Sequence, residues 1–465
     1  MRLLNVQEVL SSEAYDVEAL FTEIYDPEIF VYTVLSHRWA DFAREEVSYQ
    51  DLLQRRNLNG KGFEKIRCAC ETACAHGFAH IWIDTCCIDK TSSAELTEAI
   101  NSMWSWYRMA NECYVYLVDL PELSHDGQCL WTTNSAGNRC LRQDTLGYLK
   151  ESKWFTRGWT LQELLAPDHV LFLNVEWKPV ATKTELTQEL SFITRIPKRY
   201  LTRPNRLLEA SVAMRMSWVS RRRTTRIEDM AYCLLGILNV NMPLLYGEGR
   251  KAFMRLQLEI IKKNRDDSIF AWATDHQHQE LLATLWPTLN ADERHRGLLA
   301  LWPTAFAGSG SIVRFKVPDD FRFTYSMTNH GMELRCSNLS EVGSDDEENV
   351  LESPETQSQA DIGADWQGSS RTELRNYQSV RTAKSDQKRP KKFRLTCGDC
   401  GEADMDVLSN HELRRIAQRN VICVVLTIKG SEWRRVSCDG RETRKKYLKG
   451  LTAAHSVIYV PQDGM

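Results

Sequence analysis

One acidic side chain among apolar and aromatic neighbours is the first candidate for chemistry in this chain. Glu163 lies in WFTRGWTLQEL, residues 154–164, with Trp159 before it and Leu164 directly after it. A carboxylate fixed in such surroundings can stabilise a cation that develops on a bound molecule, an effect often worth several kcal/mol. The residue also has a structural interpretation, because Thr160-Leu161-Gln162-Glu163 fits the capping-box pattern.

The two interpretations of Glu163 place the start of its helix differently. In a capping box, the Thr160 hydroxyl accepts a hydrogen bond from the residue 163 N–H, which stabilises the helix by about 1 kcal/mol. Ala166-Pro167 follows at once, and a residue before proline resists the helical conformation. A helix that starts near Thr156 instead places Glu163 at mid-helix, where it caps nothing. The local sequence leaves both alternatives open.

Alternating strands and helices must position this residue. Short apolar runs predict buried strands at 30–35, 80–84, 113–118 and 169–173. Helices are predicted between them, over 61–77 and after the capping box Ser92–Glu95. This alternation predicts an α/β fold with a parallel sheet and flanking helices. Ligand sites form beyond the carboxyl ends of such strands, so we expect chemistry in the loops after Leu35, Asp84 and Asp119.

The later part of the chain has a different pattern of polar and apolar residues. Residues 121–147 are polar and predict a surface insertion, and residues 184–263 are helical in pattern, with a capping box at Thr225–Glu228. Short β-like segments then predict a small antiparallel region. The expected domains are 1–180, a helical extension over 181–266, and a β-rich domain over 267–337 and 391–465, interrupted by a disordered acidic and basic insertion at 338–390.

Bulk composition narrows the class of protein. The chain has 465 residues, a net charge of −3 and a pI near 6.4, so nucleic acid and membranes are not expected partners. No apolar run is long enough to span a bilayer, and the first residues make a poor signal peptide. The 14 cysteines have no regular spacing and indicate reduced thiols in the cytoplasm, with a basic run at Lys388–Lys392 as a weak nuclear signal.

Several other motifs have a structural interpretation that is favoured over the functional one. The cysteines at 68, 70 and 74 lie in one predicted helix and Cys397-Gly-Asp-Cys400 has no second half, so no metal site is expected. Cys86-Cys87 is expected to pack rather than react, and Arg221–Arg223 to form a solvated loop. Tyr246-Gly-Glu-Gly-Arg250 predicts a turn, with anion binding at a helix N-terminus as the alternative.

Four ordered blocks carry a family resemblance. SHRW (36–39), WIDTCCIDK (82–90), EAINSMWSWYRMANECYVYLVD (98–119) and WFTRGWTLQEL (154–164) resemble the successive blocks of the fungal heterokaryon-incompatibility (HET) domain. Residues 221–249 resemble the helical segment that follows this domain in many members, and 328–336 resembles a weaker β-rich motif. Some members continue into an NTPase and propeller repeats, neither of which is expected in this sequence.

The HET domain is similar, more remotely, to the Toll/interleukin-1 receptor (TIR) domain, which implies a flavodoxin-like parallel sheet. On that pattern W-T-L-Q-E-L falls on W-C-x-x-E-L, whose glutamate is catalytic in those TIR domains that cleave NAD. The resemblance therefore implies Glu163 as the catalytic residue, although Thr160 replaces the cysteine. Substrate-binding residues are then expected at Ser36, His37, Arg38, Trp39, Asp84, Arg157 and Trp159.

The chemistry needs few groups. The nicotinamide of NAD leaves as a neutral base, and one carboxylate near the ribose can stabilise the oxocarbenium-like transition state. Trp39 or Trp159 could stack on a flat base, and Arg38 or Arg157 could pair with the diphosphate.

Two functions of different class follow. The first is an incompatibility effector that cleaves NAD or a related nucleotide once oligomerised, with NAD as substrate and no resident cofactor. The second is a non-enzymatic signalling module of the same fold that acts by self-association or by binding a protein partner. The enzyme needs the carboxylate of Glu163, whereas the signalling module loses at most a helix cap without it.

Overall fold

The computed structural model describes twelve stretches of the chain. They are residues 1–11, 16–121, 131–133, 139–273, 276–287, 298–314, 323–328, 331–336, 391–399, 421–429, 432–439 and 457–460. These residues divide between two compact units, Met1–Glu209 with Arg221–Ala252 (unit 1) and Ala210–Ser220 with Phe253–Met465 (unit 2). The predicted insertion at 338–390 lies outside the described residues.

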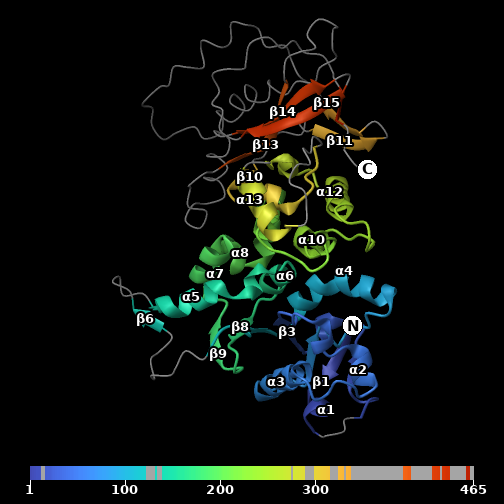
Figure 1. Ribbon diagram of the computed structural model, residues 1–465, viewed down its shortest axis with the longest axis vertical. Coiled ribbons are helices and arrows are strands. Elements are labelled where there is room, and N and C mark those ends of the chain that lie inside the picture. Colours follow the sequence, from blue (N-terminus) through green and yellow to red (C-terminus); the bar gives the residue numbers. More distant parts are fainter. Residues whose placement is uncertain are drawn as a thin grey trace, which may run out of the picture. The chain divides into compact units, whose positions relative to one another are not determined.

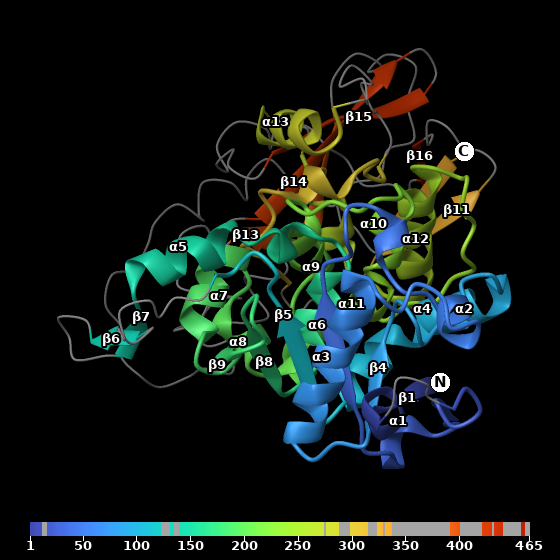
Figure 2. The same cartoon turned by 60° about the horizontal axis from the view of Figure 1, so that its bottom comes forward.

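A seven-stranded sheet forms the core of unit 1 (Figure 1), in the order β2-β1-β4-β3-β5-β8-β9. Its four central strands are parallel, as predicted, and Figure 2 shows β4, β5 and β8 among them. Strand β3 lies further along the chain than expected, so that Ser36 and His37 belong to the strand itself. The central strands are β4 (His80–Ile83), β3 (Thr33–His37), β5 (Glu112–Tyr116) and β8 (Val170–Leu173).

Three short antiparallel strands complete the two edges of the sheet. Strands β1 (Arg2–Asn5) and β2 (Phe21–Glu23) extend it beyond β4, and β9 (Pro179–Thr182) extends it beyond β8. Each is brief and mixes polar with apolar residues, so the local sequence does not predict it as a strand. The sheet is therefore mixed at its edges rather than wholly parallel.

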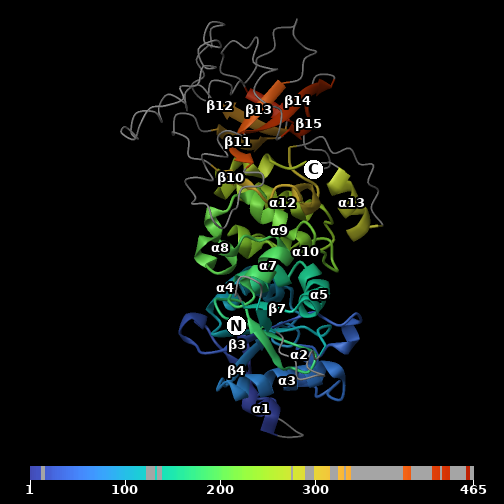
Figure 3. The ribbon, with the colours of Figure 1, turned by 90° about the vertical axis from the view of Figure 1, so that its left-hand side faces the viewer.

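Helices lie on both faces of the sheet. Helix α3 (Lys61–Ala75) lies on one face, and α4 (Ser93–Met109) and α6 (Thr160–Leu165) lie on the other (Figure 1, Figure 3). As predicted, Ser92 caps α4 by accepting from the Glu95 N–H. The short helices α1 (Val6–Ser11) and α2 (Tyr49–Leu53) precede α3, and α2 begins at a capping box of Ser48 and Asp51.

The described part of the connection from β5 to β8 contains regular elements. Strands β6 (Trp131–Thr133) and β7 (Arg139–Leu141) pair antiparallel, and helix α5 (Gln143–Glu151) follows them in the chain. Thr145 and Leu149 of α5 are buried, so the predicted polar insertion ends in a packed helix. The 3-10 helix η3 (Lys153–Thr156) then leads into α6.

Short helices complete unit 1, and they correct a second prediction. Glu228 does not cap a long helix from Thr225, because two separate turns form, α10 (Asp229–Tyr232) and α11 (Leu235–Leu238), with no side-chain cap at Glu228. Helices α7 (Thr187–Thr194) and α8 (Lys198–Leu201) and the 3-10 helix η4 (Pro204–Glu209) precede them.

Unit 2 combines helices with two antiparallel sheets, as its β-like segments predicted. One sheet has the order β10-β13-β14-β15 and the other β11-β12-β16. Figure 3 shows strands β10 to β15 of these sheets. The strands are β10 (Ile312–Arg314), β11 (Phe323–Thr328), β12 (Gly331–Cys336), β13 (Lys391–Asp399), β14 (Val421–Lys429), β15 (Glu432–Asp439) and β16 (Val457–Val460). The helices are α9 (Val212–Val219), α12 (Lys251–Lys263) and α13 (His276–Leu285).

Two observations concern the composition of the described elements. None of the described helices is both long and apolar enough to cross a lipid bilayer. The thiols of Cys86 and Cys87 are buried and free, as expected for packing residues.

Candidate functional site

The carboxylate of Glu163 is held by the strand at the centre of the sheet. Ser36, near the end of β3, donates from Oγ to Glu163 Oε2 at 2.5 Å. Trp154 of η3 donates from Nε1 to the same Ser36 Oγ at 2.9 Å. All three side chains are buried, with Glu163 5% exposed. The chain Trp154–Ser36–Glu163 thus fixes the position of the carboxylate.

The capping interpretation of Glu163 is wrong. Helix α6 begins at Thr160 itself, and its N-cap residue, Trp159, makes no side-chain cap. The Thr160 hydroxyl donates instead to the carbonyls of Trp154 (2.6 Å) and Arg157 (3.0 Å). The alternative of a helix from Thr156 is also wrong, because α6 is six residues long and Glu163 lies in its first turn. Glu163 therefore caps nothing, and its carboxylate is used for the bond to Ser36.

Two buried cations hold the ends of α6. At its start, Arg222 Nη1 donates to the Arg157 carbonyl (2.9 Å) and to Thr160 Oγ1 (3.0 Å). At its end, Lys183 Nζ donates to the carbonyls of Leu164 and Pro167. Burial lowers the pKa of Arg222 to about 10 and that of Lys183 to about 8. The prediction of a solvated loop at Arg221–Arg223 is wrong for Arg222, which is 3% exposed.

Burial makes Glu163 a weak acid. Loss of water and, second to it, the nearby Asp84 carboxylate raise its pKa, which reaches about 8. The Ser36 hydrogen bond and the Arg157 and Arg222 guanidinium groups act in the opposite direction. At neutral pH the side chain therefore holds its proton in most molecules, and a cation placed beside it would favour the ionised form.

A second polar cluster, centred on His37, lies at the same edge of the sheet. Neither ring nitrogen of the buried His37 has a hydrogen-bond partner. Nε2 lies 3.9 Å from Glu46 Oε2, and Nδ1 lies 4.0 Å from Asp84 Oδ1. Burial, with Lys65 and then Lys90 nearby, lowers the pKa of His37 well below its usual range, so the ring is neutral. A neutral imidazole has one donor and one acceptor nitrogen, and can connect two carboxyl groups.

The two carboxylates beside His37 differ in their partners. Glu46 accepts from Lys65 Nζ at 2.6 and 2.7 Å, so it already has a cationic partner. Asp84, directly after β4, accepts from Trp39 Nε1 at 2.8 Å through Oδ2, while its buried Oδ1 has no hydrogen-bond partner. Burial raises the pKa of Asp84. Asp84 is thus a carboxyl group with one oxygen free for a further partner.

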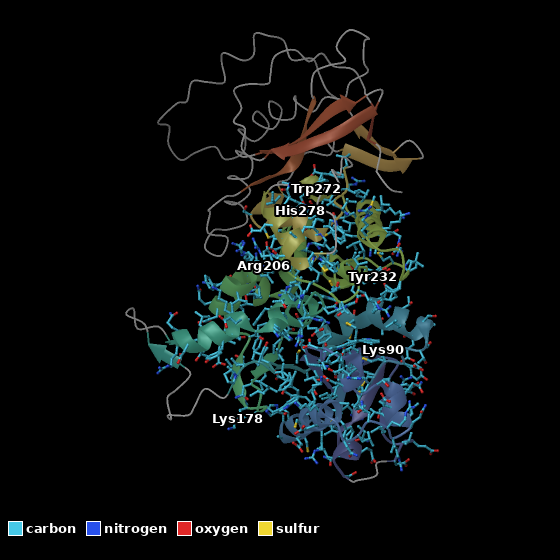
Figure 4. The ribbon with its side chains drawn as sticks, viewed as in Figure 1. Lys90, Lys178, Arg206, Tyr232, Trp272 and His278 are labelled. Atoms are coloured by element: carbon cyan, nitrogen blue, oxygen red, sulfur yellow. The ribbon has the colours of Figure 1, made fainter. Side chains whose placement is uncertain are left out.

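Trp39 lies between Asp84 and a lysine. The ammonium group of Lys90, labelled in Figure 4, lies 4.0 Å from the Trp39 ring centroid. Lys90 also donates to the Thr85 carbonyl at 3.3 Å. The loop after β4 and the residues after β3 are therefore joined directly, as the rule for carboxyl ends of parallel strands predicted.

The remaining predicted residues are less closely joined to Glu163. Arg38 is ion-paired with Asp41. Trp159 is half-buried and hydrogen-bonds to Asp229. Burial raises the pKa of Asp229, which reaches about 6 although the Trp159 hydrogen bond acts in the opposite direction. Arg157 is half-buried, and its Nη1 donates to Thr225 Oγ1 at 3.3 Å. Of the eight predicted residues, Ser36 contacts Glu163 directly, and His37, Trp39 and Asp84 form the second cluster.

Several members of the site have no signal in the local sequence. Trp154 and Trp159 both lie in residues 154–164, and nothing in their spacing indicates which of them contacts Ser36. The pair Glu46–Lys65 joins the segment before α2 to α3, and no local pattern marks such a contact. Arg222 and Lys183 have polar neighbours in the sequence, so no apolar pattern indicates that their side chains are buried.

The glycine-rich turn before α12 already holds an anion from the chain itself. Glu228 Oε1 accepts from the N–H groups of Gly247 and Gly249, at 2.9 Å each. Both glycines have positive φ, +101° and +60°, which lets their N–H groups converge. This confirms the predicted turn and leaves its donors occupied. In the part of the chain that the structure describes, no group of three or more metal-ligating side chains is assembled.

Comparisons with known proteins match the part of the chain that carries this site. Residues 32–163 match the heterokaryon incompatibility protein (HET) family, and residues 251–341 match a domain of unknown function, DUF8212. The chain is 43% identical over 254 residues to vegetative incompatibility protein HET-E-1 of Podospora anserina. This alignment covers 54% of the chain and 17% of that protein's length. No solved structure matches the chain.

Proposed function

We propose, from the premise that residues 32–163 of this chain form a heterokaryon incompatibility domain, that the protein is a fungal effector of vegetative incompatibility. The name of the Podospora relative supports this role, and the shared region spans 17% of that protein. Self-association and binding of a protein partner belong to the same proposal.

The chemistry that we propose for this effector is cleavage of the N-glycosidic bond of NAD. The observation that carries it is the buried Glu163 carboxyl, fixed by Ser36 at 2.5 Å and next to a second carboxyl at Asp84. Glu163 would stabilise the oxocarbenium-like ribose as nicotinamide leaves. The positive charge of the bound nicotinamide ring would itself favour ionisation of Glu163.

The strand order supports a TIR-like site. Counted along the chain, the parallel strands lie in the order second, first, third, fourth, which is the start of the flavodoxin-like order. Doubly wound sheets of this kind bind ligands where the order reverses, between the first and third strands. In this chain that point lies between β3 and β5, and Ser36 and His37 end β3 there.

One observation favours the second candidate, a non-enzymatic signalling module. Glu163 is 5% exposed, and Ser36 and Trp154 are more deeply buried. A neutral Glu163 in a closed hydrogen-bond chain would stabilise the domain without any contact with a reactant. In this case the domain would act through self-association or through a bound protein.

One experiment separates the two candidates. The purified full chain is concentrated to favour oligomers, and nicotinamide release from NAD is followed by chromatography. Glu163→Gln should abolish release, while Glu189→Gln, which changes another buried glutamate in α7, should not. Cells that express each variant are assayed for NAD in parallel. If the wild-type chain never consumes NAD in either assay, the signalling module is the correct function.

A further inference from the structure

Two arginines, the half-buried Arg157 and the exposed Arg223, are paired across a backbone bridge beside the start of α6. Residues 156–158 and 223 form a short parallel bridge, in which the Arg223 N–H donates to the Thr156 carbonyl (2.8 Å) and the Gly158 N–H to the Arg223 carbonyl (2.9 Å). The bridge pairs Arg157 with Arg223. Directly opposed residues of neighbouring strands project side chains to the same face. Their two guanidinium groups therefore extend from one face of the bridge.

An anion bound at this bridge would relieve the repulsion between the two like charges. Like charges directly opposite each other destabilise a strand pair. Among the described residues, no carboxylate lies in an ion pair with Arg157 or Arg223, in contrast to Arg38 with Asp41 or Arg206 with Glu209. Burial and the nearby positive charge of Arg38 lower the pKa of Arg157, while the Glu163 and Asp84 carboxylates act in the opposite direction. The net lowering agrees with a guanidinium group that has no carboxylate in direct contact.

The packing around the bridge keeps the two arginines together. A Cβ on Gly158 would lie 2.6 Å from Thr224 Cγ2 and 3.1 Å from Cys233 Sγ, so only glycine permits this approach. Arg222 holds the same segments from inside, through its bond to the Arg157 carbonyl. Backbone contacts thus fix the pairing of the two arginines, and the Arg157 guanidinium also donates to Thr225 Oγ1.

The pair is also close to the candidate site. The Arg157 charge acts on both Glu163 and Asp84, and Arg157 precedes α6 directly. A ligand that bridged the two guanidinium groups would lie beside the carboxyl cluster. Guanidinium groups bind phosphate oxygens through two parallel hydrogen bonds, and they carry their charge at every physiological pH.

We infer that Arg157 and Arg223 form a subsite for the diphosphate group of a nucleotide. The inference rests on the proposed function for the identity of the whole nucleotide, but not for the diphosphate itself. Arg38 and Arg157 were both expected to pair with the diphosphate. We assign this role to Arg157, because the Arg38 guanidinium is already paired with Asp41. It also adds Arg223, whose side chain is exposed, as predicted for this position of the loop.

The test measures binding of inorganic pyrophosphate to the full chain by calorimetry at low salt. Glu163→Gln is the common background, so that binding is measured without turnover. Arg157→Gln and Arg223→Gln should each weaken pyrophosphate binding about 10-fold or more, the loss expected for a charged hydrogen-bond pair. Arg203→Gln is the matched control, because it removes the same charge from an exposed position of unit 1. Thermal unfolding of each variant identifies any that fail to fold, and Arg157→Lys and Arg223→Lys then replace them, with partial loss expected.

Inorganic phosphate and ADP separate the sources of the anion. Pyrophosphate should bind more tightly than phosphate if both arginines are used, and ADP should bind at least as tightly as pyrophosphate. The subsite is refuted if pyrophosphate shows no saturable binding, or if Arg203→Gln weakens it as much as the other two variants.

Failure of the subsite and failure of the proposed function give different results. Arginine-dependent pyrophosphate binding without NAD cleavage by the wild-type chain would overturn the enzyme function alone. NAD cleavage with pyrophosphate binding that does not depend on Arg157 or Arg223 would overturn the subsite alone.

Discussion

The Ser36 hydroxyl and the Glu163 carboxylate meet at 2.5 Å although 127 positions separate them in the chain. One belongs to the central strand of the sheet and the other to a six-residue helix on its face. Because both groups are buried, neither could exchange this partner for water without opening the domain. The contact therefore links the stability of the domain to the ionisation of its candidate catalytic group.

Stability should fall as pH rises through the titration of Glu163. Its folded-state pKa of about 8 lies above the usual value of 4.5, so the folded chain binds the proton more tightly than the unfolded chain. This contribution is complete below pH 4.5 and is lost as pH rises to about 8, at up to about 1.4 kcal/mol per pH unit. Glu163→Gln removes the dependence, so urea unfolding at pH 9 should show the variant to be more stable than wild type. Glu189→Gln serves as control, and equal pH slopes for Glu163→Gln and wild type would contradict the prediction.

NAD cleavage should rise with pH over the same range. The proposed reaction needs the ionised carboxylate, and the free chain holds Glu163 mostly protonated below its pKa of about 8. Therefore kcat/KM should increase about tenfold per pH unit below that value and level off above it. The measurement is initial nicotinamide release between pH 6 and 9. A rate that is flat or falls over this interval would show that ionised Glu163 is not required.

Ser36→Ala should weaken both the fold and the acidity of Glu163. The Ser36 hydrogen bond lowers the pKa of Glu163, so its loss should move the rising limb of the pH profile to higher pH. The substitution also leaves Glu163 and the Trp154 Nε1 without this partner, which costs about 1–3 kcal/mol. Denaturant unfolding and the pH profile are measured together, with Ser220→Ala as a buried-serine control. A loss of stability with no change in the pH profile would separate Ser36 from the titration.

Gly158→Ala should separate the paired segments beside α6. The new Cβ would lie 2.6 Å from Thr224 Cγ2, which forces either the backbone or Thr224 to move and costs about 1–3 kcal/mol. Thr224→Ser removes the obstructing methyl group, so the double variant should recover part of the loss. Gly147→Ala is the control, since nothing lies within 4 Å of its added Cβ. If Gly158→Ala unfolds at the same urea concentration as wild type, the added Cβ does not clash with Thr224.

The central strands of the sheet could be predicted from the sequence, whereas its edge strands could not. Strands such as Val170–Leu173 are continuous apolar runs, because both faces of a central parallel strand are covered. The edge strand Phe21–Glu23 has one apolar residue in three and carries no such signal. The rule that sites form at the carboxyl ends of parallel strands correctly brought Ser36 and Asp84 to one edge of the sheet.

Individual side-chain roles were less predictable, since they depend on partners distant in the chain. The capping box at Thr160 is a valid local pattern, but the Ser36 hydroxyl bonds the Glu163 side chain instead. Arg222 lies between two other arginines, and only its contacts with Arg157 and Thr160 explain its burial. Such tertiary contacts override local propensity and leave no periodic trace in the sequence.

The separation of Ser36 from Glu163 also orders events during protein synthesis. At translation rates of about 5–20 residues per second, the 127 positions between them correspond to a delay of roughly 6 to 25 s. Throughout that interval the nascent chain carries Ser36 and then Asp84, but not the carboxylate that completes the pair. A ribosomal product that terminates before residue 163 would therefore contain most of the sheet and none of the proposed activity.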